Sequence, residues 1–257
     1  MPTAAHETQK EFFNGLSEKY DGFLAQMDAN NQIGGAVLEL IDARPHQTML
    51  DIGIGTGYYS AMIAREAGEG FRIVGVDVSD GMLAKARERF ENLGFADRVE
   101  LNNINVENYS FDQTFARAFT SSAMRYFADQ KAVVQKVYDA LVEGGRFVIQ
   151  EIRLPDNEDS FQHKMVTAFY PGLISKPTMQ SHMEQAGFKN IQSINIDMTP
   201  SSKVDIDSMR EQMESTLDEE TKERIAGIFR EAQQSGQLAR ERQSGIVFCS
   251  YMMVGEK

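Results

Sequence analysis

Three glycines stand at alternate positions, Gly53, Gly55 and Gly57, directly after the apolar segment 48–52. Because glycine has no Cβ, a turn of this kind lets the backbone approach a bound ligand closely. The spacing departs from the dinucleotide fingerprint, which places a glycine where Tyr58 stands, and the Lys-Ser/Thr pair of a Walker loop does not follow. The turn therefore predicts a ligand site that matches neither of these two motifs.

An acidic residue ends the next apolar segment after the glycine turn. Asp77 ends the apolar segment 72–77, twenty residues after Gly57. The carboxyl ends of neighbouring parallel strands meet at one edge of a doubly wound sheet, so this carboxylate is expected beside the glycine turn. There it can accept hydrogen bonds from both hydroxyls of a ribose. The pair predicts an adenosine-containing ligand.

Short apolar runs alternate with segments of helical periodicity along most of the chain, a pattern typical of parallel βαβ units. Strands are expected at residues 48–52, 72–77, 99–103, 114–119, 146–152, 190–197 and 246–254. Helices are expected at residues 58–67, 80–93, 129–141 and 177–186. The alternation predicts an α/β fold with a doubly wound, seven-stranded sheet.

Three segments exceed what this alternation needs. We expect an N-terminal helical cap in residues 1–45 and a core in residues 46–257, with helical insertions at 155–176 and 200–244 after the fifth and sixth strands. Added segments of this kind often form lids or partner surfaces. The polar helices of 200–244 could dimerise, cap the ligand site or cover the sheet edge, and their pattern does not choose among these.

Charge and composition exclude several kinds of partner and site. The 257 residues carry a formal net charge of −12, which disfavours nucleic acid as a partner. Cys249 is the single cysteine, so an internal disulfide and a cysteine-rich metal site are excluded. No apolar run approaches the roughly 20 residues of a membrane span, and the first ten residues lack the apolar region of a signal peptide. A cytoplasmic protein is expected, and a homodimer is one arrangement its polar helices allow.

Together these residues resemble the class I S-adenosylmethionine-dependent methyltransferases, in particular the small-molecule methyltransferases similar to those of ubiquinone biosynthesis. The resemblance covers about residues 51–197. Its motifs are Leu-Asp-Ile-Gly-x-Gly-x-Gly from Leu50, the acid Asp77, and the triplets 143–145 and 186–188 ahead of the fifth and sixth strands. It implies the strand order 3-2-1-4-5-7-6 with strand seven antiparallel, and S-adenosylmethionine as cofactor.

The resemblance also implies which residues meet the cofactor. Asp77 would hold the ribose, Val78 and Met82 would pack on adenine, and Asn105 stands where the family usually has an adenine-binding Asp. Met82 could instead face the core, and Asn105 could be a turn residue. Tyr20, in a Tyr-Asp pair like that of the related enzymes, would cover the cofactor or pack in the core. The residues expected to bind cofactor are Tyr20, Asp51, Gly53, Gly55, Gly57, Asp77, Val78, Met82, Asn105, Val106 and Thr120.

A sulfonium already activates its methyl group, so the protein mainly has to align the acceptor, and needs a base only when the acceptor loses a proton. His163 is the first choice for that base because it lies in the insertion after the fifth strand, with Glu151 and Tyr170 as alternatives. A structural histidine is the plainer interpretation. No convincing Asp-Asn pair follows the fourth and fifth strands, so no metal is expected.

The insertion 155–176 is rich in aromatic residues and methionine, with Phe161, Met165 and Phe169 at helical spacing. This favours an apolar lid over a flat acceptor, although a plain core face has the same spacing. The expected function is methyl transfer by direct displacement to an O, N or C atom of a small, apolar or aromatic metabolite. The alternative is a protein of this fold that binds the cofactor for a non-methyl reaction or a regulatory or scaffolding role.

Overall fold

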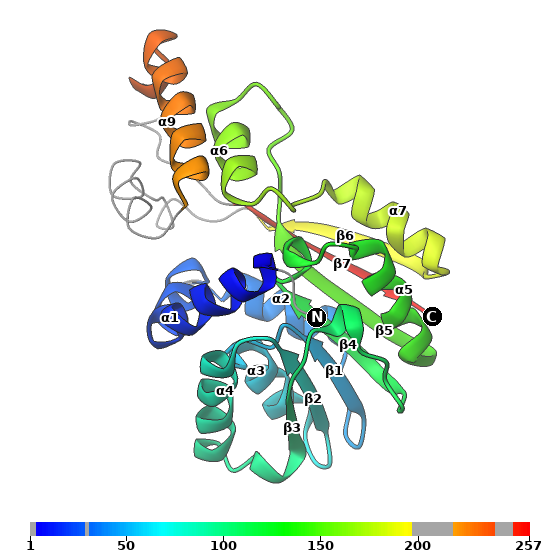
Figure 1. Cartoon of the computed structure of the whole chain (residues 1–257). Coiled ribbons are helices and arrows are strands. Elements are labelled where there is room, and N and C mark those ends of the chain that lie inside the picture. The colour runs from blue at the N-terminus through cyan, green and yellow to red at the C-terminus, as the bar shows by residue number, and fades with distance from the viewer. Residues whose placement is uncertain (1–3, 29–30, 197–217, 240–248) are drawn as a thin grey trace.

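The computed structural model describes residues 4–28, 31–196, 218–239 and 249–257. Its strands form one seven-stranded sheet in the order β3-β2-β1-β4-β5-β7-β6 (Figure 1). Strand β7 runs antiparallel to both of its neighbours, and the other pairs are parallel. The predicted fold class, strand order and orientation of the last strand are confirmed. The strands are β1 Thr48–Ile52, β2 Arg72–Asp77, β3 Val99–Asn103, β4 Phe115–Ser121, β5 Leu141–Ile152, β6 Lys189–Ile196 and β7 Ser250–Glu256.

The fifth strand differs most from its prediction. β5 begins at Leu141 rather than at residue 146, and its register against β4 shifts between Phe115 and Arg117. Gly144, with φ of +72°, therefore lies within the strand rather than in the turn before it. A glycine tolerates this left-handed backbone, so the strand continues through an irregularity that sequence patterning reads as a break. Strand β7 ends two residues later than predicted, and residues 246–248 lie outside the described part of the chain.

Helices cover both faces of the sheet, and several of them begin at a capping side chain. Ser79 accepts a hydrogen bond from the Met82 amide at the start of α4, and Asp129 accepts one from the Ala132 amide at the start of α5. The α-helices are α1 Ala4–Met27, α2 Gln32–Ile41, α3 Tyr58–Ala67, α4 Asp80–Asn92, α5 Gln130–Ala140, α6 Phe161–Phe169, α7 Lys176–Ala186 and α9 Glu219–Gln234. Three short 3₁₀ turns accompany them, namely η1 Ala96–Arg98, η2 Val106–Asn108 and η3 Met124–Tyr126.

The core has two layers because side chains alternate along each strand. Met49 packs with α2, α3 and α4 on one face, whereas its neighbour Leu50 packs with α5 and α7 on the other. Both side chains are fully buried, and burial of a side chain of this size stabilises the fold by about 1.5–3 kcal/mol. The two layers hold the carboxyl ends of the strands at one common edge.

Helix α1 is attached to this edge by polar contacts. Oδ1 of Asn14 accepts hydrogen bonds from the Ser79 hydroxyl (2.7 Å) and the Gly81 amide (2.9 Å) at the start of α4. Asp21 accepts one from the Thr56 hydroxyl (2.6 Å) in the glycine turn and pairs with Arg89. These contacts place α1 over the turn. The division of the chain at residue 45 stays a prediction.

The insertions after β5 and β6 each contribute one helix to a separate helical pair. Helix α6 packs against α9, and Figure 1 shows the two helices standing together away from the sheet. Phe161 and Phe229 meet edge to face with ring centroids 5.4 Å apart, and Met165 is buried in the same cluster. The helical spacing of Phe161 and Met165 therefore serves a local core. Residues 200–217 and 240–244 of the second insertion lie outside the described residues.

Candidate active site

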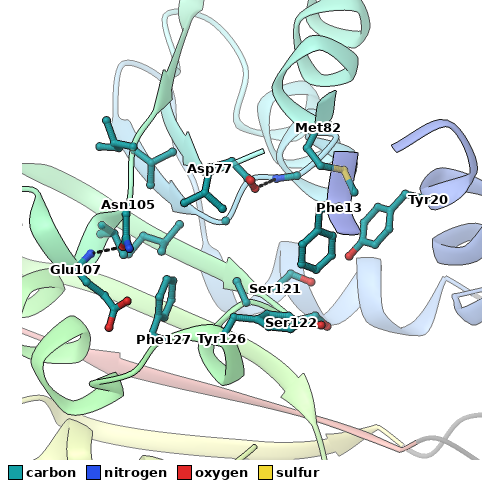
Figure 2. A pocket seen from close by; sticks show the side chains of 18 residues that line it. Phe13, Tyr20, Asp77, Met82, Asn105, Glu107, Ser121, Ser122, Tyr126 and Phe127 are labelled. Carbon is teal, nitrogen blue, oxygen red and sulfur yellow. Dashed lines mark hydrogen bonds between the residues drawn. The ribbon is translucent and has the colours of Figure 1, made fainter. Parts of the chain in front are cut away.

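A pocket of about 660 Å³, its open mouth included, lies at the carboxyl ends of the first four strands. Figure 2 shows Phe13 and Tyr20 from α1 toward one end and Asn105 and Glu107 toward the other. The lining residues are Phe13, Tyr20, Ile52, Gly53, Gly55, Val76, Asp77, Val78, Met82, Ile104, Asn105, Val106, Glu107, Ser121, Ser122, Ala123, Tyr126 and Phe127.

The glycine turn and Asp77 form one hydrogen-bonded unit. The Gly55 amide donates to Oδ2 of Asp77 (2.9 Å; Figure 2), and the Ser79 amide donates to Oδ1 (2.9 Å). Burial raises the pKa of Asp77, and these backbone bonds act in the opposite direction. Each carboxylate oxygen has capacity for a further bond, so the side chain can accept ligand hydroxyls at the pocket wall.

The three glycines have different tasks, although all three have positive φ. A Cβ on Gly53 would lie 2.5 Å from the Cβ of Ala123, so this glycine lets the turn meet the segment after β4. A Cβ on Gly57 would lie 2.8 Å from the Phe90 ring, and Gly57 does not line the pocket. Above Gly55 the nearest atom belongs to Tyr20, at 3.9 Å. Of the three glycines, only Gly55 therefore leaves open space where a Cβ would stand, and that space faces the pocket.

Asn105 lines the pocket and also shapes the turn after β3. Its Oδ1 accepts the Glu107 amide (2.9 Å) as the N-cap of η2. Lys136 donates to the carbonyls of Val106 (2.7 Å), Glu107 (3.0 Å) and Tyr109 (2.6 Å), which stabilises the same turn from outside. The turn-forming interpretation of Asn105 is thus present in the structure, together with its place in the pocket wall.

Two predicted contact residues lie behind the wall instead. Asp51 is 3% exposed and accepts a hydrogen bond from the Ser60 hydroxyl in α3. Burial raises the pKa of Asp51 to about 7, with a smaller opposing effect of Ser60. Thr120 is fully buried, and its hydroxyl donates to the Ile52 carbonyl (2.8 Å). Neither side chain lines the pocket, so both support the strand ends from below.

Several lining residues were not predicted from the sequence. Phe13 is one of them, and its ring meets Tyr126 edge to face at 5.3 Å. Its spacing of seven residues from Tyr20 on one helix was a usable signal, because residues i and i+7 share a face. Ser121 ends β4, and Ser122, Tyr126 and Phe127 follow it, where the sequence offered polar and aromatic types but no motif.

Comparison with known proteins identifies the family. A family model described as a methyltransferase domain matches residues 43–233. The chain belongs to this family. Among relatives, the methyltransferase is 26% identical over 210 residues to the ubiquinone/menaquinone biosynthesis C-methyltransferase UbiE of Klebsiella pneumoniae, covering 72% of this chain and 84% of that one. It is 30% identical over 146 residues to the same enzyme of an Enterobacter species, covering 56% and 58%.

Solved structures share the fold of this methyltransferase. The YcgJ protein of Bacillus subtilis superposes with a TM-score of 0.67 at 20% identity, covering 87% of this chain and 97% of that one. Phosphoethanolamine N-methyltransferase 2 of Haemonchus contortus, solved with S-adenosylhomocysteine, superposes with a TM-score of 0.61 at 22% identity, covering 87% and 52%. The predicted resemblance to class I S-adenosylmethionine-dependent methyltransferases is confirmed by the family match.

His163 lies in the insertion and not in the pocket wall of the methyltransferase. Its Nδ1 lies 2.7 Å from the Pro155 carbonyl, and its amide donates to the Ser160 hydroxyl at the start of α6. Both contacts stabilise the first turn of that helix. The structure therefore does not bring His163 together with the cofactor-side residues, and a role as base receives no geometric support.

The alternatives to His163 belong to a buried ionic cluster beside the pocket. Glu151 is 1% exposed and forms an ion pair with Arg125. The guanidinium of Arg125 stacks on the rings of Tyr170 (4.4 Å) and Tyr126 (4.9 Å). Burial acts to lower the pKa of Arg125, but Glu151, Tyr126 and Tyr170 together more than offset this, so the pKa of Arg125 is raised. Through Tyr126 the cluster supports the pocket wall opposite Asp77.

The described residues contain no group of three or more His, Cys, Asp or Glu side chains placed to bind a metal ion together. Independence from metal stays a prediction that rests on the sequence. None of their helices combines the length and the apolar character that crossing a bilayer requires.

Proposed function

We propose that this methyltransferase moves the methyl group of S-adenosylmethionine to an O, N or C atom of a small, flat metabolite. The observation that carries the proposal is the pocket in which the Gly55 amide and the Asp77 carboxylate are joined at the wall. Its chain belongs to a family of methyltransferase domains.

The residues present fit this cofactor. Asp77 offers carboxylate oxygens to a ribose, while Val78, Met82 and Val106 offer apolar surface to a flat base. The missing Cβ of Gly55 leaves room for the remaining part of the cofactor. When bound, S-adenosylmethionine supplies an electrophilic methyl group. In this proposal Asp51, Gly57 and Thr120 support the site rather than contact the cofactor, since none of the three lines the pocket.

The chain's own contribution is alignment and exclusion of water. Phe13, Tyr20, Tyr126 and Phe127 form an aromatic wall at the pocket. Burial raises the pKa of the Tyr20 phenol, so Tyr20 stays protonated and can donate a hydrogen bond. A flat acceptor held between such rings loses rotational freedom before reaction, which is a large part of the barrier for a group transfer.

The relatives support an aromatic acceptor. UbiE is named as a C-methyltransferase of ubiquinone and menaquinone biosynthesis. The aromatic wall of this chain suits the same kind of ring. We therefore infer an acceptor with an aromatic or quinol-like ring.

The test has a binding arm and a transfer arm. Calorimetry with S-adenosylhomocysteine should show one site, and labelled methyl groups should appear on 1,4-naphthohydroquinone or on another ring of a panel of phenols, anilines and hydroquinones. Absence of binding would remove the proposal. Binding without transfer to any acceptor, in the panel or in a cell extract, would favour the alternative of a cofactor-binding protein with a non-methyl or regulatory role.

Two expectations about partners accompany the proposal. The net charge of −12 argues against nucleic acid. A homodimer through the insertion 200–244 is a further proposal, and light scattering of the full chain tests it. A molar mass near 28.9 kDa would exclude the dimer at that concentration.

A further inference from the structure

A chain of polar side chains crosses the sheet below the pocket. The hydroxyls of Ser121 (2.7 Å) and Ser122 (3.2 Å) both donate to Oε1 of Gln150 on β5. Nε2 of Gln150 in turn donates to the Ser250 hydroxyl on β7 (3.1 Å). Gln150 is 3% exposed and Ser250 is 1% exposed. We call these four residues the serine-glutamine network.

A buried carboxamide in the middle of a sheet is costly unless its polar atoms are bonded. Gln150 stands in a strand whose neighbours Ile149 and Ile152 are buried and apolar, and an apolar residue at position 150 would avoid that cost. Here the amide bonds reach the two serines that line the pocket. The network therefore fixes the direction in which the two serine hydroxyls point at the pocket wall.

The two serine hydroxyls have their hydrogens committed to Gln150. A hydroxyl has one hydrogen and two lone pairs, so toward the pocket each serine presents an acceptor. Ser122 is also held in an unusual backbone conformation, with φ of +56°, and its amide donates to the Gln150 carbonyl (2.9 Å). Such a conformation in a residue other than glycine is maintained by its surroundings. The paired acceptors are thus preset before a ligand arrives.

The two serines lie at the end of the pocket that we assign to the methyl acceptor. Asp77 and Asn105 define the nucleoside side of the proposed cofactor site, whereas Ser122 lies toward Tyr20 and Tyr126 (Figure 2). The wall around the serines is otherwise aromatic and apolar. A pair of oriented acceptors within such a wall can distinguish ring systems by whether they carry an N–H or O–H donor.

We propose that Ser121 and Ser122 bind an O–H or N–H donor of the methyl acceptor, and that Gln150 acts as a positioning residue that orients both hydroxyls. The proposal rests on the proposed function, because it assigns one end of that pocket to the acceptor. It selects phenols, hydroquinones and anilines over ring systems that lack a donor.

The probes are 2-naphthol, which carries a donor, and 2-fluoronaphthalene, which lacks one. Their dissociation constants are measured by NMR titration on protein saturated with S-adenosylhomocysteine. The preference for 2-naphthol, taken as the ratio of the two constants, should fall about fivefold in Ser121→Ala/Ser122→Ala, the usual effect of one neutral hydrogen bond. Each single variant should lose part of this preference. An unchanged ratio in the double variant overturns the proposal.

Variants of Gln150 test the positioning role. Gln150→Leu keeps both serines but frees their hydroxyls, so the preference should fall as well, while Gln150→Glu keeps an acceptor for both hydroxyls and should preserve it. An unchanged preference in Gln150→Leu removes the role of Gln150. Ser181→Ala, at a half-buried serine of α7 that accepts a hydrogen bond from Gln185 and does not line the pocket, is the matched control and should change neither constant.

Cofactor binding separates this inference from the proposed function. S-adenosylhomocysteine affinity, measured by calorimetry, should stay within about twofold in each serine variant, which also shows that the variant is folded. If the wild type does not bind S-adenosylhomocysteine, the proposed function fails. If the double variant loses that affinity while its preference for 2-naphthol persists, the serines meet the cofactor instead, and the inference is overturned.

Discussion

The two sides of the pocket solve the same physical problem in different ways. At the ends of β1 and β2, the buried carboxylates of Asp51 and Asp77 accept hydrogen bonds from a serine hydroxyl and backbone amides. Near the ends of β4 and β5, the buried carboxylate of Glu151 is neutralised by Arg125. On the first side Asp77 lines the pocket while Asp51 supports the strand ends behind it, and on the second side Glu151 holds a wall in place. A buried acid is therefore functional or structural according to its partner.

The largest expected effect is on the β4–β5 side. Glu151→Gln leaves the charge of Arg125 buried without its carboxylate, so the free energy of unfolding should fall by about 3–5 kcal/mol. Urea denaturation measures it. Glu231→Gln is the matched control, because Glu231 forms an exposed pair with Lys164 and should cost at most about 1 kcal/mol. If the free energy of unfolding falls equally in the two variants, the buried pair of Glu151 and Arg125 is no more important for stability than an exposed one.

The next effect concerns the β1–β2 side. Asp77→Ala should weaken binding of S-adenosylhomocysteine by about 1.5–3 kcal/mol, because a charged acceptor is lost from the ribose site. Calorimetry provides the measurement. Glu88→Ala, at an exposed acid on α4, should bind like the wild type. Normal affinity in Asp77→Ala would contradict the ribose assignment and make this carboxylate structural too.

Asp51 allows a test by pH. Its folded pKa of about 7 lies above the ordinary value of 3.8 because of burial, so the folded protein binds more protons than the unfolded chain between these values. Stability should therefore fall as pH rises from about 4 to 7, by at most about 1.4 kcal/mol per pH unit for this group. Asp51→Asn should flatten the slope in urea denaturation across that window. An unchanged slope would show that Asp51 ionises normally.

The smallest effect is expected at His163. His163 lies in α6, outside the pocket, and His163→Ala removes its contact to the Pro155 carbonyl ahead of that helix. Methyl transfer and S-adenosylhomocysteine affinity should therefore stay within about twofold. Loss of the helix contact should lower stability by about 1 kcal/mol. Loss of a general base would instead lower turnover by about 100-fold or more. A drop of that size, with binding intact, would place the insertion at the chemistry after all.

Prediction from the sequence succeeded in placing residues whose positions depend on the local order of strand, turn and helix. The glycine turn and Asp77 are joined by one hydrogen bond between neighbouring strand ends, and strand-turn-helix order suffices to place both. It was less accurate where geometry depends on distant segments. β5 extends back to Leu141 because its partner strand tolerates a register shift, and Gly57 faces Phe90 because α4 packs there.

The amino-acid sequence by itself determined the α/β fold class and the family resemblance, because periodicity and glycine spacing act over a few residues at a time, and the strand order followed from that resemblance. Only the tertiary structure decided which buried polar groups face the ligand. Ser121, Gln150 and Ser250 meet across three strands, and Phe13 reaches Tyr126 from another helix. Contacts between segments far apart in the chain arise from packing, which leaves no local pattern in the residues that make them.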